Sequence, residues 1–513
     1  MRRVLDRSAA NGAQVVWFKR DLRVDDHHAL LEASRRGPCI CLYVYEPDVI
    51  AGDDYDAAHL TFVNESLVAL RSALETLGGQ LTIQTGRMPD VLEQLHRTVG
   101  IAHLWSHEET GNATTYARDR RVTAWTKEAG VQWTQIPCNG VVRRLQTRDG
   151  WSRQWHERMH SAVAPRPTSI ESVAGLACAP IRGPTGFGLE VGKRETTQIG
   201  GLESAEDTLA SFLRERGVNY KRDLSSPGPA WTSCSRLSPY LAWGNLSMRQ
   251  VLHATRARVE VLGDEPGSVA GAPRSWLPSL RSFEQRLRWH CHFIQKLEDE
   301  PSIEFYNMNR AYDGLREDRF DELKFAAWKA GQTGFPMVDA CMRALTQSGW
   351  INFRMRAMLV SFASYHLWLH WRPTALHLAR LFVDYEPGIH YSQVQMQSGV
   401  TGINTVRIYS PIKQVIDQDP EGEFIRQHCP ELALVPSAYL SRPEEMPAPV
   451  QAAAGCVIGR DYPQPIVDHL TAYRAARQQM YAVKGSKQAR LNAKNVYHKH
   501  GSRRQPLRQR ASS

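Results

Sequence analysis

The spacing of apolar segments divides this chain into two unlike parts. Before residue 145, short apolar runs alternate with helical stretches, and the runs cover 13–18, 39–45, 80–86, 101–109 and 131–137. Apolar residues over 60–78 recur at helical spacing and end at a pair of glycines. Strands and helices in this alternation form a parallel sheet with helices on both faces. We therefore predict a Rossmann-like, five-stranded parallel α/β domain over 13–145.

A helical part follows a connection. Residues 146–204 contain many prolines and glycines and show little periodicity, which indicates an interdomain linker. From 205 to 478 the pattern is helical and strand signals are almost absent, so we predict an all-α domain. The apolar stretch 350–371 is one long helix or two. Its arginines and histidines indicate a core helix rather than a membrane span.

The chain ends in a basic segment. No acidic residue follows Asp468, and we predict that 479–513 is a flexible tail. Such a tail either keeps the chain soluble or contacts DNA phosphates. The whole sequence has 63 Lys and Arg against 53 Asp and Glu, a formal charge of +10. This balance suits a nucleic-acid partner, and a merely basic soluble protein explains it equally well.

Other features narrow the class of protein. No glycine-rich phosphate loop follows the first strand, so a conventional dinucleotide or P-loop site is not expected. The nine scattered cysteines favour free thiols in a reducing compartment, and no ligand run supports a metal site. The first residues lack an apolar signal region, and no apolar run of about 18 residues exists. We expect a cytoplasmic monomer with no membrane partner.

Two segments carry candidate chemistry for binding anions and bases. In 220–239, a tyrosine precedes a turn-rich loop and the cluster TSCSRLS, whose hydroxyls and helix-start N–H groups suit phosphate oxygens. Helix capping alone also explains such a cluster. In 279–293, the arginines 281, 286 and 288 share a helix with Trp289. Cations among aromatic rings suit nucleic acid, although a solvated basic face gives the same pattern.

Two later segments are further candidates. Arg356 lies in an apolar helix, where an unpaired charge would be costly, and Asp384 in a similarly apolar segment is its candidate partner. This pair either lines a ligand site or is structural. The amide- and glycine-rich stretch 392–414 ends at Gln414. It is either a binding loop or an ordinary surface loop.

Five blocks of the chain, taken in order, resemble the cryptochrome/photolyase family. They are VVWFKRDLRVDDHHAL (15–30), TSCSRLSPYLAWGNLS (232–247), GQTGFPMVDACMRAL (331–345), GWINFRMR (349–356) and DPEGEFIRQHCPEL (419–432). Together they make the resemblance far more specific than any single motif, and it extends over roughly residues 13–475. The resemblance implies an α/β N-terminal domain and an all-α C-terminal domain that binds FAD. An antenna chromophore near 108–112 is left open.

The resemblance also implies roles for individual residues. It implies that FAD is bound by Tyr220, Cys234, Ser235, Arg236, Leu237, Ser238, Arg356, Asp384 and Glu386. It implies contacts with DNA or the lesion from Gln285, Trp289, Trp350, Arg354 and Gln414. It implies proton or electron transfer through Glu284, Trp371, His390 and Tyr391. In this family, photoexcited reduced FAD passes an electron to a pyrimidine dimer flipped out of UV-damaged DNA, and the cyclobutane ring opens.

Some positions depart from the family pattern on the lesion side. Arg286 stands where dimer-repairing relatives often carry a glutamate, so Glu284 or Gln285 is the candidate substitute. Phe353 stands where dimer enzymes usually have asparagine and (6-4) enzymes have histidine. These departures weaken any assignment of the lesion type.

Other departures lie beside the flavin. The stretch PGIHYSQVQ (387–395) lacks the asparagine expected near flavin N5, and His390 is the nearest candidate. Tyr391 replaces the inner tryptophan of the family's electron relay, Trp371 matches the middle one, and Asp318 stands where the outer one is expected. Because tyrosine is harder to oxidise than tryptophan unless its proton leaves, we predict slow photoreduction of oxidised FAD.

Three functions remain in competition at this point. The first is a DNA photolyase, a carbon–carbon lyase that repairs cyclobutane pyrimidine dimers, and it rests on the basic charge, Trp289, Arg354 and Gln414. The second is a cryptochrome-like blue-light photosensor, which the altered lesion-side residues and the basic tail permit. The third is a (6-4) photolyase, which Asn352 and Phe353 disfavour because histidines are expected there.

Overall fold

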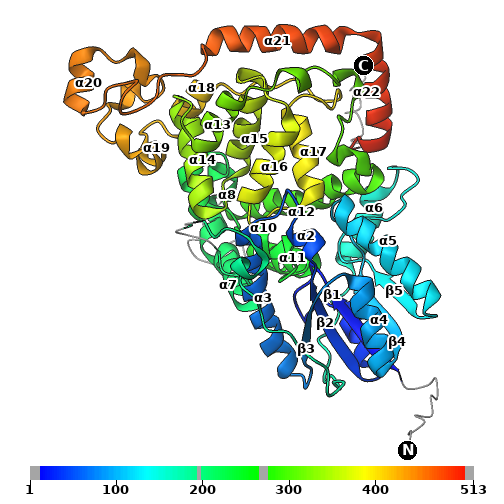
Figure 1. The fold of residues 1–513 in the computed structure, drawn as a ribbon. Coiled ribbons are helices and arrows are strands. Elements are labelled where there is room, and N and C mark those ends of the chain that lie inside the picture. The colour runs from blue at the N-terminus through cyan, green and yellow to red at the C-terminus, as the bar shows by residue number, and fades with distance from the viewer. Residues whose placement is uncertain (1–11, 193, 195–197, 265–274, 503–513) are drawn as a thin grey trace, which may run out of the picture.

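The N-terminal part of the chain is a parallel α/β domain, as predicted. The computed structural model describes residues 12–192, 194, 198–264 and 275–502 (Figure 1). Its five-stranded sheet has the order β3-β2-β1-β4-β5, and all of its neighbouring strands are parallel. The strands are β1 (Ala13–Phe18), β2 (Cys39–Tyr45), β3 (Leu81–Thr85), β4 (Ile101–His107) and β5 (Gln132–Ile136). Each strand falls within one of the predicted apolar runs.

Helices cover both faces of the sheet. They are α1 (His28–Ser34), α2 (Pro47–Ile50), α3 (Ala57–Glu75), α4 (Met88–Val99) and α5 (Ala113–Glu128). Successive side chains of β1 point to opposite faces. Val15 and Trp17 join the core under α4 and α5, whereas Val16 and Phe18 join the core under α1 and α3. The core under α1 and α3 continues into the helical domain, so the two domains share one continuous hydrophobic core.

The rest of the chain is helical, and among the described residues no strand follows β5. The helices are α6 (Trp151–His160), α7 (Leu202–Arg214), α8 (Tyr220–Asp223), α9 (Pro227–Ser233), α10 (Ser238–Ala242), α11 (Met248–Asp264), α12 (Trp276–Asp299), α13 (Glu322–Ala330), α14 (Pro336–Ser348), α15 (Phe353–Ser361), α16 (Trp371–Leu381), α17 (Pro387–Gln397), α18 (Pro411–Gln418), α19 (Glu423–His428), α20 (Ala448–Ala454), α21 (His469–Gly485) and α22 (Lys487–His500). None of the helices described is both long and apolar enough to cross a bilayer.

Two predicted segments differ in detail. Helix α6 lies inside the predicted linker 146–204 and buries Trp151 and Trp155, so part of this connection belongs to the core. The apolar stretch 350–371, predicted as one long helix or two, holds α15, and the next helix, α16, begins only at its last residue, Trp371. Helix α15 passes into a π-helical turn, and the backbone then breaks at Trp368, whose φ of 57° is left-handed.

The predicted flexible tail is largely ordered helix, which corrects that expectation. Helix α21 runs to Gly485, and Ser486 caps α22 by accepting a hydrogen bond from the backbone N–H of Ala489. Ala489, Val496 and His500 form the buried face of α22. Only these few residues show helical spacing, and basic residues surround them. The basic composition of the segment therefore led to the prediction of a flexible tail. The remainder of the tail, 503–513, and the N-terminal 1–11 lie outside the described residues.

The loop after β1 attaches the helical domain to the sheet. The Arg20 guanidinium donates to the carbonyls of Ala242 at 2.9 Å and Tyr385 at 2.6 Å. Arg23 donates to the carbonyl of Gly244 at 3.0 Å. The backbone passes so closely that a Cβ at Gly244 would lie 2.2 Å from the carbonyl oxygen of Arg20, and its φ is +75°. Glycine is therefore required at this contact.

The same loop is held at the sheet by a buried carboxylate. Asp21 lies between two imidazole rings, 2.6 Å from Nδ1 of His107 and 3.1 Å from Nε2 of His27. Burial lowers the pKa of His107 to about 3, so its ring is neutral and donates to Asp21. These three groups are close enough for a metal ion. Within the described part of the chain, the contact between His107 and Asp21 is the one hydrogen bond among them, and Nε2 of each ring has no hydrogen-bond partner.

Candidate functional site

A cavity of about 640 Å³ lies within the helical domain. Residues of α8, α10, α12, α15 and α17 contribute to its wall, and the end of α22 closes one side. Its volume falls within the roughly 300–1,000 Å³ typical of cofactor and ligand sites. The sequence-predicted cofactor residues on this wall are Tyr220, Cys234, Ser235, Arg236, Ser238, Arg356, Asp384 and Glu386. Leu237 is buried behind the wall.

The extended segment between α9 and α10 is held open by one arginine. Arg216 donates from Nη1 to the carbonyls of Thr232 at 2.8 Å and Cys234 at 2.7 Å. Its Nη2 donates to the carbonyl of Ser235 at 3.3 Å. These carbonyls are turned toward Arg216, and the side chains of Cys234 and Ser235 reach the cavity. Sequence reasoning missed Arg216, because it lies sixteen or more residues before the carbonyls that it binds.

Arg236 carries a positive charge to the cavity wall. Its backbone is left-handed, with φ at 59°, and its guanidinium lies 4.0 Å from the ring centre of Trp350 and 4.4 Å from that of Trp231. Burial lowers the pKa of Arg236 to about 10, so the group remains charged at neutral pH. A guanidinium held on aromatic faces beside serine hydroxyls is suited to a phosphate group.

Arg356 and Asp384 form a bidentate ion pair on the cavity wall. Nη1 and Nη2 donate to the two carboxylate oxygens at 2.9 and 2.8 Å, and Nε donates to the carbonyl of Ile351 at 2.8 Å. Burial alone would raise the pKa of Asp384, but the charge and hydrogen bonds of Arg356 hold it below its usual value. The pair therefore presents fixed charges of both signs to a ligand.

Several buried polar atoms on this wall have no hydrogen-bond partner within the described part of the chain. They are Asn352 Oδ1, His290 Nδ1, Glu386 Oε1, Gln393 Oε1 and His500 Nδ1. Burying such atoms without partners is costly, and native sites satisfy them with a ligand or water. Acceptors and a ring nitrogen beside the paired charges fit the hydrogen-bonding edges of an isoalloxazine ring, so these residues are compatible with FAD.

One side of the cavity is aromatic and cationic. Trp289 and Phe353 both line it, and the guanidinium of Arg286 lies 5.9 Å from the ring centre of Phe353. Phe353 is 44% exposed, so this wall reaches the surface. Stacking rings beside a cation suit a nucleic-acid base with its phosphate.

Four of the predicted lesion-side residues do not line this cavity. Glu284 faces Arg256 instead and accepts its hydrogen bonds at 2.6 and 2.8 Å. Gln285 is exposed on the outer side of α12, Gln414 is buried in α18, and Arg354 also lies off the wall. Arg286, which stands at the family's glutamate position, lies on the wall instead. A helix turns 100° per residue, so its neighbours 284 and 285 point away.

The predicted relay residues lie behind the wall. Tyr391 and Trp371 are fully buried with ring centres 6.4 Å apart, and Nε1 of Trp371 donates to Asn307 at 2.7 Å. Asp318 is exposed. His390 lines the cavity, and its Nε2 bonds the carbonyl of Ala375 at 2.8 Å.

A neutral ring is expected at His390. Burial lowers the pKa of His390 to about 4, although the bond to the Ala375 carbonyl opposes this shift. With Nε2 donating to that carbonyl, Nδ1 is left as a hydrogen-bond acceptor. His390 is therefore an acceptor beside the ligand at neutral pH rather than a proton donor.

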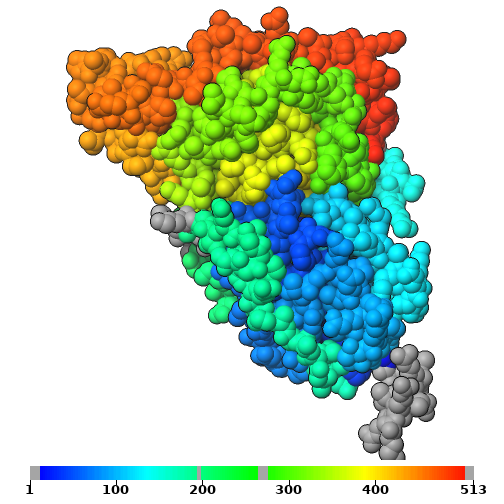
Figure 2. All heavy atoms as spheres, in the orientation of Figure 1, coloured from blue at the N-terminus to red at the C-terminus, as the bar shows by residue number. Residues whose placement is uncertain are grey.

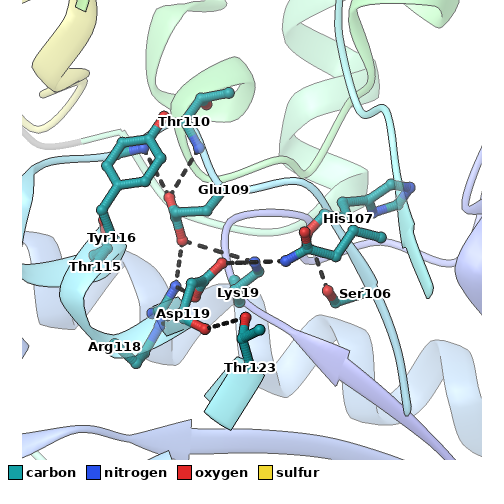
Figure 3. A network of polar contacts seen from close by, with 12 residues as sticks. Lys19, Ser106, His107, Glu109, Thr110, Thr115, Tyr116, Arg118, Asp119 and Thr123 are labelled. Carbon is teal, nitrogen blue, oxygen red and sulfur yellow. Dashed lines mark hydrogen bonds and ion pairs between the residues drawn. The ribbon is translucent and has the colours of Figure 1, made fainter. Parts of the chain in front are cut away.

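The stretch left open for an antenna is occupied by a charged network (Figure 3). Glu109 is buried, bonds Arg118, and accepts from the backbone N–H groups of Thr110 and Gly111 at 3.1 and 2.8 Å. Lys19 lies 3.4 Å from Asp119 and 3.8 Å from Glu109. Burial and then Arg118 act on Glu109, and the net effect lowers its pKa to about 2. The carboxylate is thus committed to contacts within the protein.

Further wall residues were absent from the sequence prediction. Phe293 and Lys296 follow the predicted Arg286 and Trp289 along α12 at spacings of three or four residues, and all four line the cavity. Helical periodicity could have added Lys296 to the set, since it shares the face of Trp289. Tyr385 and His500 could not have been found in this way, because only the tertiary fold brings them to the wall.

The fold and this cavity define a class: an α/β domain joined to a helical domain that holds a large cofactor. Family models support the cofactor's identity. A model described as the FAD binding domain of DNA photolyase matches residues 283–482, and a DNA photolyase model matches residues 14–157. A deoxyribodipyrimidine photo-lyase of Agrobacterium fabrum is 29% identical over 497 residues, covering 92% of this chain and 98% of the relative.

Other relatives are named cryptochromes. Cryptochrome-2 of Arabidopsis thaliana is 27% identical over 486 residues, covering 89% of this chain and 77% of the relative. Among solved structures, a bacterial class III photolyase from Agrobacterium tumefaciens superposes with a TM-score of 0.79 at 28% identity, covering 93% of this chain and 98% of that one. The chain belongs to the cryptochrome/photolyase family and contains its FAD-binding domain.

Proposed function

We propose that this protein is a DNA photolyase that uses light to split cyclobutane pyrimidine dimers. The observation that carries the proposal is the junction of two surfaces in one cavity. Residues suited to FAD occupy one part of the wall, and Trp289, Phe353 and Arg286 occupy another. A flipped pair of pyrimidines could therefore stack beside the cofactor. The formal charge of +10 favours a DNA partner.

Each part of the wall has a separate task in this proposal. Bound FAD supplies the light-driven electron transfer. Arg356 and Asp384 orient it through the bidentate pair, and Arg236 neutralises phosphate charge. The indole of Trp289, with its ring stacked 5.6 Å from Phe293, provides a flat face that excludes water from the lesion. These residues bind and position, and none of them needs to move a proton.

Lesion type is the finer part of the proposal. Asn352 donates from Nδ2 to the carbonyl of Leu224 at 3.1 Å, and Phe353 carries no proton donor. Repair of a (6-4) lesion needs a protonatable group, which the family supplies as histidine at these positions. His290, one of the histidines on the wall, has a pKa lowered to about 4 by burial, so it is a poor acid at neutral pH. This combination favours the cyclobutane dimer.

The decisive experiment is a repair assay with both lesions. Purified protein with reduced FAD would be illuminated with blue light beside oligonucleotides that contain a single cyclobutane dimer or a single (6-4) lesion. We expect recovery of intact thymines from the first substrate only. A dark sample and the Trp289→Ala variant serve as controls. Absence of repair with a fully reduced, FAD-loaded protein would contradict the proposal.

A cryptochrome-like photosensor is the second candidate. It is favoured by the loss of a carboxylate from the lesion side, since Arg286 lies on the wall and Glu284 is paired with Arg256. A photosensor would bind undamaged and dimer-containing DNA equally, or bind neither. Comparison of the two affinities in the dark separates it from a repair enzyme.

A further inference from the structure

A second cavity of about 250 Å³ adjoins the large one and is accounted for by none of the roles assigned above. The two cavities share Trp289, His292, Gly501 and Ser502. The second alone is lined by Arg148, Trp151, Ser152 and Arg288. We call it the side pocket. It lies where helix α22, red in Figure 2, meets the segment that leads into α6, drawn in cyan.

The side pocket combines flat rings with guanidinium groups. The guanidinium of Arg148 lies 5.4 Å from the ring centre of Trp151, and Arg288 donates to Ser152 Oγ at 3.3 Å. His292 stands edge-on to both tryptophan rings, 5.8 Å from Trp151 and 5.0 Å from Trp289. Aromatic faces give stacking surface for a base, and guanidinium groups bind phosphate oxygens.

Positive charge is in excess at the junction of the two cavities. Arg148, Arg288 and Lys296 gather there, and the nearby carboxylate of Asp299 lies 3.2 Å from Nε of Arg148. Burial and then the charge of Arg148 lower the pKa of Lys296 to about 7. Burial, with Lys296 and Arg148 next, lowers that of His292 to about 2. An anion bound at the junction would relieve this repulsion.

We propose that the side pocket binds one nucleotide of the DNA strand that flanks the extruded lesion. Its base would stack between the tryptophan side chains, and its phosphate would lie between Arg288 and Lys296. The volume suits a single nucleotide and is too small for a second cofactor of FAD size. Continuity with the large cavity at Trp289 makes the occupant a direct neighbour of whatever stacks on that ring.

This inference deepens the proposed function and rests on it. Side chains at the junction would fix the register of the strand on the protein, independently of the lesion itself. The end of α22 would act as one wall of the pocket through Gly501 and Ser502. Helix α22 lies beyond the stretch matched by the family model, which ends at residue 482. The side pocket therefore combines residues from both matched stretches with Gly501 and Ser502, which lie beyond them.

The test couples protein variants to single missing bases. Duplexes with one dimer would carry one abasic nucleotide, placed in turn at each position beside the lesion. Binding would be measured in the dark by fluorescence anisotropy for the wild type, Arg288→Ala and Lys296→Gln. Arg281→Ala is the matched control, because it removes a cation from the same helix two turns earlier and lines neither cavity.

We expect Arg288→Ala and Lys296→Gln each to weaken binding about ten-fold, and Arg281→Ala to change it less than three-fold. One abasic position should weaken wild-type binding and have little further effect in Arg288→Ala. The absorbance of bound FAD should be the same in the wild type, Arg288→Ala and Arg281→Ala, which shows that the large cavity is intact.

Three results would overturn the inference. The first is equal behaviour of Arg288→Ala, Lys296→Gln and Arg281→Ala. The second is the absence of any abasic position whose effect on binding is lost in Arg288→Ala. The third is a pocket that binds free thymidine monophosphate in an Arg288-dependent manner while DNA binding is unchanged. If the wild type repairs dimers in these cases, only the side pocket is refuted. If the wild type neither binds nor repairs dimers, the proposed function falls and the inference falls with it.

Discussion

Tyr385 donates a hydrogen bond to Asp54 across the boundary between the two domains, with 2.5 Å between the hydroxyl and the carboxylate oxygen. Tyr385 lines the large cavity, and Asp54 also accepts from Asn112 at 2.9 Å. Burial is the main reason why the pKa of Tyr385 is raised well above its usual value, so the phenol is neutral. Its proton already has an acceptor in place.

This contact predicts how oxidised FAD is photoreduced. A tyrosine gives up an electron readily only if its proton leaves, and Asp54 can take the proton from Tyr385. We expect photoreduction in the presence of a thiol to be slower in D2O than in H2O. The Asp54→Asn variant should slow it further, by roughly ten-fold, or about 1.4 kcal/mol in the barrier. An unchanged rate in both tests would exclude Tyr385 as a donor.

Tyr391 gives a second prediction about the same reaction. Its ring centre is 6.5 Å from that of Tyr385 and 6.4 Å from that of Trp371. Tyr391→Trp restores an aromatic ring that is oxidised without loss of a proton, so photoreduction should become roughly ten-fold faster, about 1.4 kcal/mol. Flavin content and the melting temperature must stay close to wild type, because the larger ring enters a packed site. Tyr391→Phe, which keeps the volume, should not accelerate the reaction.

Removal of the carboxylate at Asp384 should weaken the binding of FAD. Asp384→Asn leaves Arg356 without its ionised partner, which for a buried pair costs about 3 kcal/mol. We expect a lower melting temperature and loss of co-purified FAD, measured by flavin absorbance per chain. Glu431→Gln is the matched control. It breaks a 2.7 Å pair with Arg343 whose side chains are each more than a fifth exposed, and should cost less than about 1 kcal/mol.

Gly388 sets the distance between two walls of the cavity. A Cβ at this position would lie 2.5 Å from the Cα of Ile294, so Gly388→Ala must push α17 and α12 apart. Overpacking of this kind costs roughly 1–3 kcal/mol. We expect weaker FAD retention and a lower melting temperature. Gly228→Ala in α9 is the control, since nothing lies within 4 Å of its Cβ and alanine favours a helix.

Buried histidines predict a loss of stability in mild acid. Burial lowers the pKa of His290 to about 4 and those of His366 and His377 to about 3. Below about pH 6.5 the unfolded chain binds protons at these positions and the folded protein does not. The contribution of these neutral rings to the free energy of unfolding is therefore fully present above pH 6.5. It falls as the pH drops toward 4, by up to about 1.4 kcal/mol for each group and each pH unit.

Urea unfolding at pH 7.0 and pH 5.5 measures this effect. The difference should shrink by about 1.4 kcal/mol in His377→Leu, which removes one such group and keeps an apolar side chain beside Trp328. Stability that is equal at both pH values would contradict the assignment of neutral buried rings.

The strands of the sheet could be predicted from the sequence because each one is marked by a local run of apolar residues. The runs 13–18 and 39–45 coincide with β1 and β2 to the residue, since every side chain in them is apolar or packed. The break at Trp368 was not accessible, because a left-handed tryptophan has no sequence signature and depends on its surroundings. Arg316 supplies part of these surroundings, with its guanidinium 4.5 Å from the ring centre of Trp368.

Site prediction divides in the same way. Arg356 and Asp384 could be matched by the cost of a buried charge, and the structure joins them at 2.8 and 2.9 Å. Glu284 was a candidate because it lies near Arg286 at the family's glutamate position, but its carboxylate is paired with Arg256 of the neighbouring helix α11. Such a contact between helices depends on packing angles. A single sequence does not encode those angles in any local pattern.

Gln295 has a consequence for how substrate reaches the cavity. Its amide oxygen accepts from the backbone N–H of Val142 at 2.7 Å, and its amide nitrogen donates to the carbonyl of the same residue at 2.8 Å. The side-chain amide thus pairs with the backbone of Val142 as a neighbouring β-strand would, and it attaches α12 to the end of the α/β domain. An opening motion of the two domains about their boundary would have to break both of these hydrogen bonds. Under the proposed function, distortion during recognition would therefore fall on the DNA duplex rather than on the contact between the two domains.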